Sequence, residues 1–174
     1  MASPTYTLIS SNVLTGSAAS VTFSSIPSTY TDLVLKVSAR NDDTAAFGVL
    51  YMQFNGSGGT AYSRTILRGS GSAAISASSS NTSEFQSSAT GVVGGSATAN
   101  TFSSAEFYIP SYTSSQNKPA SYFGVNEDNA TAAYMGAIAN LWSSSATITS
   151  ISVYLSGVNF VSGSSFYLYG ISNT

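Results

Sequence analysis

The sequence DLVLKVSAR, at residues 32–40, alternates apolar and polar side chains with a period of two. This is the period of a β-strand, in which successive side chains point to opposite faces of a sheet. The expected inward side chains are Leu33, Leu35, Val37 and Ala39, and the expected outward ones are Asp32, Lys36, Ser38 and Arg40, with Val34 as the exception. The stretch therefore predicts a strand with one face in a core and the other in water.

The same alternation recurs along much of the chain. Val21 and Phe23 alternate with polar neighbours just before this strand, and Pro27 ends their pattern because proline cannot donate to a strand ladder. Further strands are predicted at residues 49–55, 62–68, 103–109, 120–125, 134–142, 147–155 and 165–171.

Two of these assignments depend on further reasoning. We expect 49–55 and 62–68 to form a hairpin, because the glycine-rich turn at 55–59 joins them. The alanine-rich stretch 130–141 would also suit a short helix, but Gly136 and the aromatic residues around it favour a strand.

Residues 69–100 differ from the rest, because they are nearly all Ser, Ala, Thr, Gly and Asn. Such a composition buries little apolar surface. We expect a low-complexity surface excursion with one or two weak strands, carried by a single domain that spans residues 1–174.

Nine or ten strand signals without helical periodicity predict an all-β fold, an antiparallel β-sandwich. A jelly roll is our first expectation within this class, because long excursions between strands are common there. An immunoglobulin-like topology is the second.

The composition argues against most kinds of chemistry. The chain has no histidine and no cysteine, 7% of its residues are charged, and its net charge is −2. Catalytic and metal sites depend on such groups, so we expect no enzyme, no metal and no cofactor. Five basic residues are too few for a nucleic-acid stripe or a polybasic membrane patch, so neither partner is expected.

The remaining candidates for a site are few. Glu106 and Glu127 would have to meet in space to act as a glycosidase pair, and Glu106 on a polar strand face is more simply a solvated side chain. Asp42-Asp43 and Glu127-Asp128 offer oxygen ligands for calcium, but Asp is also a good turn former.

Aromatic side chains offer a binding surface instead. Exposed aromatic rings bind sugars and form protein interfaces. The candidates in the richest aromatic region are Tyr112, Tyr122, Tyr134 and Trp142. The competing interpretation, which we favour, places these residues in the core or in cross-strand pairs.

Both ends of the chain resemble a known class of protein. The block YTLISSNVLTGSAASVTFSSIPSTYTDLVLKVSAR, residues 6–40, resembles a recurrent block in virion proteins of tailed bacteriophages, cyanophages especially. The block ITSISVYLSGVNFVSGSSFYLYGI, residues 148–171, resembles the end of the same kind of domain. The resemblance implies a jelly-roll or related sandwich of the capsid decoration (cement) or tail-fibre type, and it carries no catalytic motif.

The resemblance and the small size together favour a capsid decoration protein. It would bind the outside of the assembled head, as a homotrimer, with the major capsid protein or another virion protein as partner. It would be made in the host cytoplasm and end in the virion. The alternative is a tail-fibre, spike or head-fibre module that recognises a host surface glycan.

Overall fold

The computed structural model describes residues 5–129 and 133–172, and over these residues the chain forms strands and one short 3-10 turn. The strands are β1 (Tyr6–Val13), β2 (Ser20–Phe23), β3 (Asp32–Ser38), β4 (Phe47–Gly48), β5 (Tyr51–Phe54), β6 (Tyr62–Gly69), β7 (Ala74–Thr82), β8 (Phe85–Gln86), β9 (Val92–Val93), β10 (Ser104–Ile109), β11 (Lys118–Val125), β12 (Met135–Trp142), β13 (Ile151–Tyr154) and β14 (Ser165–Ile171). The 3-10 turn, η1, spans Ser88–Thr90. No helix in the described part of the chain is long and apolar enough to cross a membrane.

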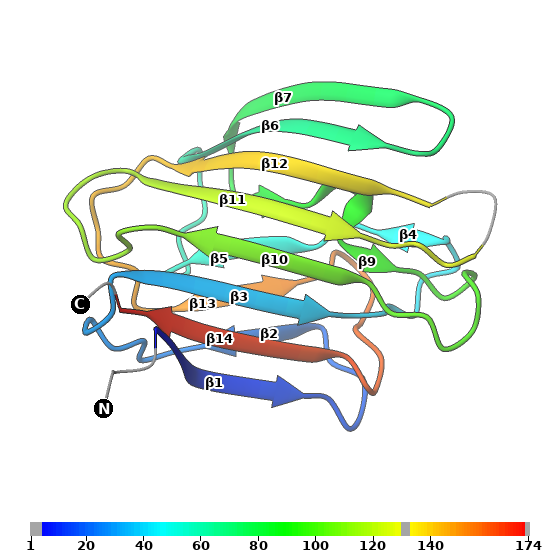
Figure 1. The fold of residues 1–174 in the computed structure, drawn as a ribbon, viewed down its shortest axis with the longest axis horizontal. Helices are drawn as coiled ribbons and strands as arrows, with labels where there is room; N and C mark the ends of the chain where they lie inside the picture. The colour runs from blue at the N-terminus through cyan, green and yellow to red at the C-terminus, as the bar shows by residue number, and fades with distance from the viewer. Residues whose placement is uncertain (1–4, 130–132, 173–174) are drawn as a thin grey trace.

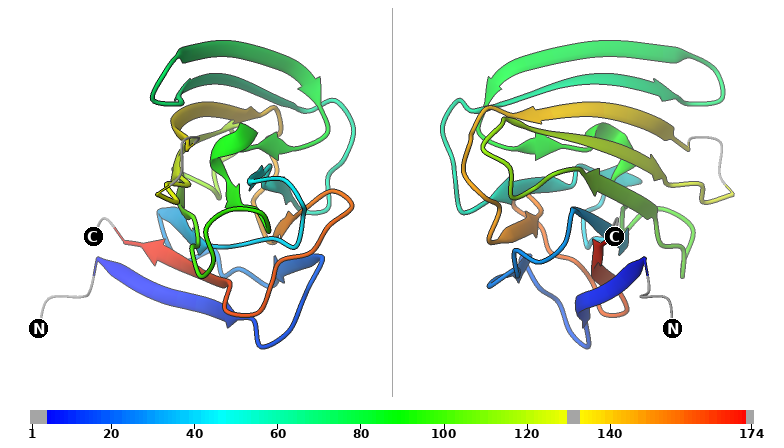
Figure 2. Two further views of the ribbon diagram at one scale, coloured as in Figure 1. Left: turned by 90° about the vertical axis from the view of Figure 1, so that its right-hand side faces the viewer. Right: turned by 60° about the vertical axis from the view of Figure 1, so that its left-hand side comes forward.

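Two antiparallel sheets form the layers of a sandwich, which confirms the predicted fold class. The first sheet has eight strands in the order β1-β14-β3-β10-β11-β12-β6-β7, and the second has four in the order β2-β13-β5-β8. Figure 1 shows the large sheet in front, from β1 at the bottom to β7 at the top, with the smaller strands behind it. The pair β4-β9 adds a small ladder in the second layer, and Figure 2 shows the layers from the side.

The pairing of the strands is nested. β1 pairs with β14, β2 with β13, β3 with β10, and β5 with β8, so the first strands of the chain meet the last and the pairs converge inward. β14 then also pairs with β3, and β13 with β5, which joins the pairs into sheets. The two ends of the chain therefore lie in one part of the molecule.

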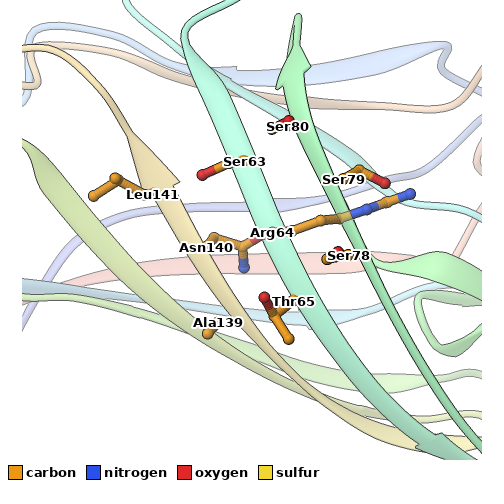
Figure 3. Close-up of a pocket in the computed structure, with 9 residues that line it drawn as sticks. All are labelled: Ser63, Arg64, Thr65, Ser78, Ser79, Ser80, Ala139, Asn140 and Leu141. Atoms are coloured by element: carbon orange, nitrogen blue, oxygen red, sulfur yellow. The ribbon is translucent and has the colours of Figure 1, made fainter.

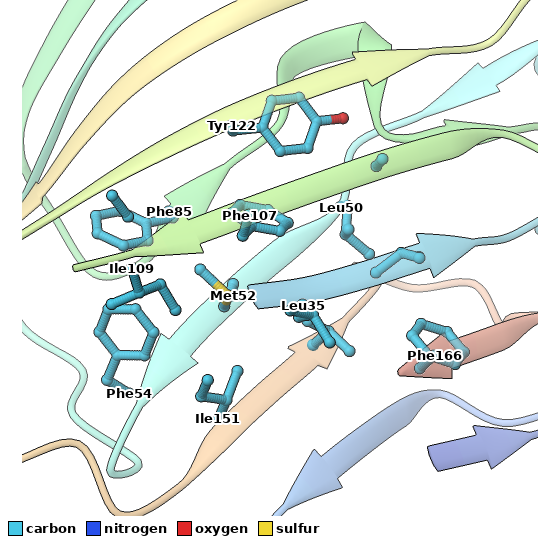
Figure 4. Packing of buried hydrophobic residues seen from close by; sticks show 14 of the residues in the cluster. Leu35, Leu50, Met52, Phe54, Phe85, Phe107, Ile109, Tyr122, Ile151 and Phe166 are labelled. Atoms are coloured by element: carbon cyan, nitrogen blue, oxygen red, sulfur yellow. The ribbon is translucent and has the colours of Figure 1, made fainter. Parts of the chain in front are cut away.

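A hydrophobic core fills the space between the two sheets. The inward side of the alternation predicted for residues 32–40 is confirmed, since Leu33, Leu35, Val37 and Ala39 are all buried. Asp32, expected in water, is instead buried, because its carboxylate accepts hydrogen bonds from the Tyr108 hydroxyl and the Ser111 N–H. Figure 4 shows the centre of this core, where Phe107 and Leu35 of the large sheet face Met52 and Leu50 on the chain that forms the second. The prediction of a strand rather than a helix near residues 134–142 is also confirmed by β12, while residues 130–132 lie outside the described part.

The predicted hairpin of 49–55 with 62–68 is wrong. β5 belongs to the second sheet, whereas β6 lies in the large sheet between β12 and β7. The reason is that the buried side chains of Met52 and Phe54 lie beside buried residues of β13 in the second sheet. Those of Tyr62 and Ile66 lie beside buried residues of β12 in the large sheet. The turn between them therefore carries the chain from one layer to the other.

The Ser- and Ala-rich segment 69–100 is only partly the surface excursion that its composition predicts. It contains three strands, β7, β8 and β9, and it buries Phe85, Val92 and Val93 completely or nearly so. Its small residues let the backbone come close to the core, and buried hydroxyl groups supply the hydrogen bonds that this approach needs. The Ser87 hydroxyl, for example, accepts a hydrogen bond from the Leu50 N–H at 2.8 Å.

Arg40 holds the end of this segment in place. Its guanidinium group donates hydrogen bonds to the carbonyl oxygens of Gly95, Ala97, Thr98 and Thr101, at 2.8 to 3.1 Å. The planar guanidinium fork suits this task because it presents several donors in fixed directions. A charged side chain of the predicted strand thereby orders a loop whose own sequence specifies little.

Candidate functional site

Three of the four aromatic residues proposed as a binding surface are in the core. Tyr112 is 0% exposed, and Tyr122 and Trp142 are each 2% exposed, so the favoured interpretation as core residues is confirmed for these three and the surface interpretation is wrong. Tyr112 donates a hydrogen bond from its hydroxyl to the carbonyl of Pro27. Trp142 packs against Phe54, with ring centroids 5.5 Å apart. Their apolar area is used to hold the two sheets together.

Tyr122 illustrates why a polar aromatic residue is buried here. Its ring packs against Phe107 at 4.7 Å, and its hydroxyl donates to the Thr90 carbonyl oxygen at 2.8 Å. Burial raises the pKa of this phenol strongly, so the group stays neutral. The segment 69–100 thus supplies the partner that lets a tyrosine occupy a core position.

Tyr134 is half-buried and lies apart from the other three. Its ring meets Phe47 edge-on at 4.7 Å, and the Arg68 guanidinium lies 5.0 Å from the ring centroid. The structure therefore does not bring the four predicted residues together into one site.

The uncovered side of the eight-stranded sheet, which we call the outer face, is the candidate functional surface. Strand register defines two rows across it. One row contains Tyr169, Val34, Tyr108 and Ser121, and the next contains Tyr167, Lys36, Glu106 and Phe123. Ala137 of β12 and Leu67 of β6 continue the second row beyond Phe123.

The outer face is unusually apolar for a surface in contact with water. Phe123 is 49% exposed, and Leu67 is 61% exposed in the same row. Tyr6 and Leu8 of β1 are also exposed, and the Tyr6 ring meets Tyr169 edge-on at 6.3 Å. One face of an antiparallel sheet is normally polar when it is solvated, and extended apolar patches on such a face mark interaction sites.

The charges within these rows cancel. Lys36 Nζ lies 2.8 Å from Glu106 Oε2, with side chains that are 54% and 46% exposed. The hydrogen bond from Lys36 to Glu106 and the charge of the carboxylate together raise the pKa of the lysine. Because the pair is neutral as a whole, it adds no net charge to the aromatic rows.

Neighbouring side chains in the first row explain why an apolar residue, Val34, lies on the outward side of β3. It lies on the outer face but is only 1% exposed, because Tyr169 and Tyr108 flank it on the neighbouring strands. Tyr108 is fixed in turn by Asp32, whose carboxylate accepts a hydrogen bond from the Tyr108 hydroxyl at 2.9 Å. Tyr108 is therefore held in place on this face by a hydrogen bond as well as by packing.

Hydroxyl groups replace aromatic rings toward the β7 edge. A hollow of about 460 Å³ lies there, and Figure 3 draws the residues of β12, β6 and β7 that line it. Its outward-facing hydroxyls are Ser63, Thr65, Ser78 and Ser80, beside Ala139 and Leu141. We call this site the hydroxyl hollow. It is open to solvent, and the groups on its outer side are uncharged.

The outward side of the second sheet carries a different, polar arrangement. Tyr51 and Tyr154 stack across neighbouring strands, with ring centroids 5.4 Å apart. The Tyr154 hydroxyl lies 3.4 Å from Glu84 Oε2, and Gln86 donates to the other Glu84 oxygen at 3.0 Å. Burial, followed by the Glu84 charge, raises the pKa of Tyr154 to about 12.

The carboxylates considered for catalysis or calcium are engaged elsewhere or dispersed. Glu106 is paired with Lys36 on the outer face. Asp42 binds the Asn159 backbone N–H at 2.8 Å, and these contacts with Asn159 lower the pKa of its carboxyl group. Within residues 5–129 and 133–172, no three Asp or Glu side chains gather as a metal site.

A signal for the outer face was present in the sequence. Tyr108, Tyr167 and Tyr169 alternate with Phe107, Phe166 and Leu168, so aromatic residues occupy the side that a soluble strand usually leaves polar. Phe123 gave no such signal, because its neighbour Tyr122 has a similar character. Only the register with Phe107 decides which of the two points inward.

Comparison of the chain with models of protein families, with curated proteins and with solved structures found no match.

Proposed function

We propose that this chain is a structural virion protein, a capsid decoration protein that binds the outside of an assembled phage head and stabilises it. The observation that carries the proposal is the outer face, a broad apolar sheet surface with one internally neutralised ion pair. Aromatic, weakly charged surfaces of this kind suit docking to another protein.

The position of the two phage-like blocks supports the proposal. Residues 6–40 contain β1, β2 and β3, and residues 148–171 contain β13 and β14. These strands pair directly with one another in both sheets, although the blocks are far apart in the sequence. The two resemblances therefore fall on one packed unit and not on two unrelated segments.

The same pairing supports the finer assignment of the fold as a jelly roll. In a jelly roll, a long antiparallel hairpin of eight strands rolls into two sheets. The first strand then pairs with the last, the second with the next to last, and the inner strands follow the same order. Here these strands are β1, β2, β3, β5, β8, β10, β13 and β14. In this assignment β6, β7, β11 and β12 are additions that widen the large sheet.

Stabilisation would follow from mass action. A protein that binds only the intact shell lowers the free energy of that shell relative to the open one, so opening requires more heat or force. We propose that it acts as a homotrimer on the capsid exterior, in contact with the major capsid protein or another virion protein. Symmetric oligomers bind several neighbouring subunits at once.

The test compares capsids assembled without the protein, before and after the purified chain is added. The expected result is a higher rupture temperature with the wild-type chain. Phe123→Glu puts an unpaired charge on the outer face and should abolish the rise. Ser20→Glu places the same charge on the outward side of β2 in the second sheet and should not. An unchanged rupture temperature with the wild-type chain would overturn the proposal.

The hydroxyl hollow favours recognition of a host glycan as a second candidate function. The recess is rich in hydroxyl groups, which offer donors and acceptors to an uncharged sugar, and Arg64 also lies among its lining residues. Thr65→Trp would fill the recess, while Ser152→Trp on the second sheet is the matched control. Binding to a panel of host polysaccharides that is lost only in Thr65→Trp would support this function, and no binding by the wild-type chain would exclude it.

A further inference from the structure

Strands at the edge of a sheet expose backbone N–H and C=O groups that can pair with another chain, and natural proteins usually protect them. The two main sheets have four such edges: β1 and β7 in the large sheet, and β2 and β8 in the small one. These edges differ in how they are protected, and the difference points to one of them.

Three of the four edges carry a recognised protection. β8 has two residues and β2 has four, so neither offers a long row of backbone groups. β1 has eight residues, but its register shifts between Leu8 and Ser10. A bulge of this kind bends the strand and interrupts regular pairing in its middle.

β7 has none of these protections over most of its length. It is nine residues long, with the sequence AISASSSNT, and it contains no charged residue, no proline and no glycine. Its register with β6 is continuous from Ala74 to Ser79, and the irregularity comes only beyond that point. Within the described residues β7 pairs with β6 alone, and its side chains are exposed on both faces.

We propose that β7 joins two copies of this chain by antiparallel edge-to-edge pairing. A second copy fits this edge for two reasons. Identical uncharged edges do not repel one another, and the small Ser and Ala side chains leave room for a second backbone on either face. Pairing about a two-fold axis is self-complementary and closes on itself, so it produces a finite pair and not a fibre.

The pairing leaves the aromatic rows of the outer face free, so it does not depend on the proposed capsid function. It makes the number of chains in the free particle even, so a homotrimer held by other contacts would join a second homotrimer and give six chains. The first measurement is therefore the mass of the full chain by sedimentation equilibrium over a range of concentrations. A mass that corresponds to one or three chains at every concentration would overturn the proposal.

The second measurement uses charge to block the edge. Ser76→Lys together with Ser78→Lys adds lysines that point into solvent, which is a protection that natural edges use. We expect association to weaken at least about tenfold, because like charges then face each other. Ser11→Lys, on the same face of the β1 edge, is the matched control and should leave the mass unchanged. If Ser11→Lys separates the copies and the β7 variant does not, the assignment to β7 is wrong.

The third measurement locates the axis. The chain has no cysteine, so single cysteines can be placed at each residue from 74 to 79 without interference. In a two-fold antiparallel pair, one residue lies opposite its own copy, at a Cα distance of about 4.5–5.5 Å that permits a disulfide. Cross-linking should peak at one position and fall at both neighbours. Equal cross-linking at all six positions would indicate random collision and contradict the pairing.

Discussion

Two glycines that face each other across β11 and β12 determine how closely the segment 87–91 approaches the large sheet. Gly124 pairs with Gly136, and both lie on the inward side. A Cβ at Gly124 would lie 2.6 Å from the Thr90 carbonyl oxygen and would also meet the Tyr122 phenol. The absent side chains therefore make room for the hydrogen bond that satisfies the buried Tyr122 hydroxyl.

We predict that Gly124→Ala destabilises the fold. The added methyl group must displace backbone at Thr90 or the Tyr122 ring, which costs about 1–3 kcal/mol of unfolding free energy in a packed core. Urea unfolding followed by circular dichroism measures this change. Gly16→Ala is the control, because a Cβ there meets nothing within 4 Å. Equal effects of both substitutions would contradict the close approach.

The environment of Tyr154 predicts that the unfolding free energy falls at alkaline pH. Burial, the Glu84 charge and the neighbouring Tyr51 and Tyr62 raise its folded pKa to about 12, above the ordinary tyrosine value of 10.0. The folded state thus retains the phenolic proton that the unfolded state releases. This contribution to stability is present below pH 10 and is lost as the pH rises toward 12. Unfolding free energies measured across this window should fall less steeply in Tyr154→Phe than in the wild type, and parallel curves would contradict the assignment.

At the scale of the elements, Lys118 connects two turns. It is fully buried at the start of β11, and burial lowers the pKa of its ammonium group. The group donates hydrogen bonds to the carbonyl oxygens of Ser114, at 2.6 Å, and of Gln116 in the turn before β11. It also reaches the Ser144 carbonyl, at 3.4 Å, in the connection after β12.

We predict that Lys118→Met lowers the unfolding free energy by about 2–4 kcal/mol, because several carbonyl groups lose their donor together. Amide hydrogen exchange should rise at residues 111–117 and 143–146. The other lysine of the chain gives the control: Lys36→Met removes only an exposed ion pair and should cost less than about 1 kcal/mol. A similar cost for both lysines would mean that the buried contacts contribute little.

The strands that the sequence predicts well are those with strict alternation, such as residues 32–38, 104–109 and 165–171. Burial of one face dictates their pattern, so the pattern can be read without the partner strand. β7 was not predicted as a defined strand, because Ser and Ala on both exposed faces leave no alternation to detect. Its position depends on pairing with β6, which a local pattern does not encode.

For a similar reason, local patterns do not predict which strands pair or which aromatic side chains are buried. The glycine turn at 55–59 suggested a hairpin, yet β5 and β6 entered different sheets once their apolar rows met β13 and β12. Both a surface and a core position suit Tyr112 and Trp142 in the sequence, because aromatic character alone does not distinguish a core ring from an exposed one. Their hydrogen-bond and ring partners come from distant segments, at Pro27 and Phe54.

At the scale of the whole molecule, the low charge has a measurable consequence. The chain has five basic and seven acidic residues, and Lys36 with Glu106 is the salt bridge found in the described part. We predict that the unfolding free energy and the affinity for capsids change little between about 0.05 and 0.5 M salt, because exposed charges that salt would screen contribute little. A steep loss of capsid affinity with added salt would contradict docking through the neutral outer face.

The nested pairing also sets the order in which the molecule can be completed. Tyr6 of β1 finds its partner in Ile171 of β14, so the first strand stays unpaired until nearly the whole chain has left the ribosome. At translation rates of about 5–20 residues per second, that delay is roughly 10–30 s. During this delay Tyr6 and Leu8 lie in an unpaired segment of the nascent chain. A chaperone can bind this segment, or it can associate with another nascent chain. Slow synthesis at low temperature should lengthen this exposure and lower the yield of folded protein.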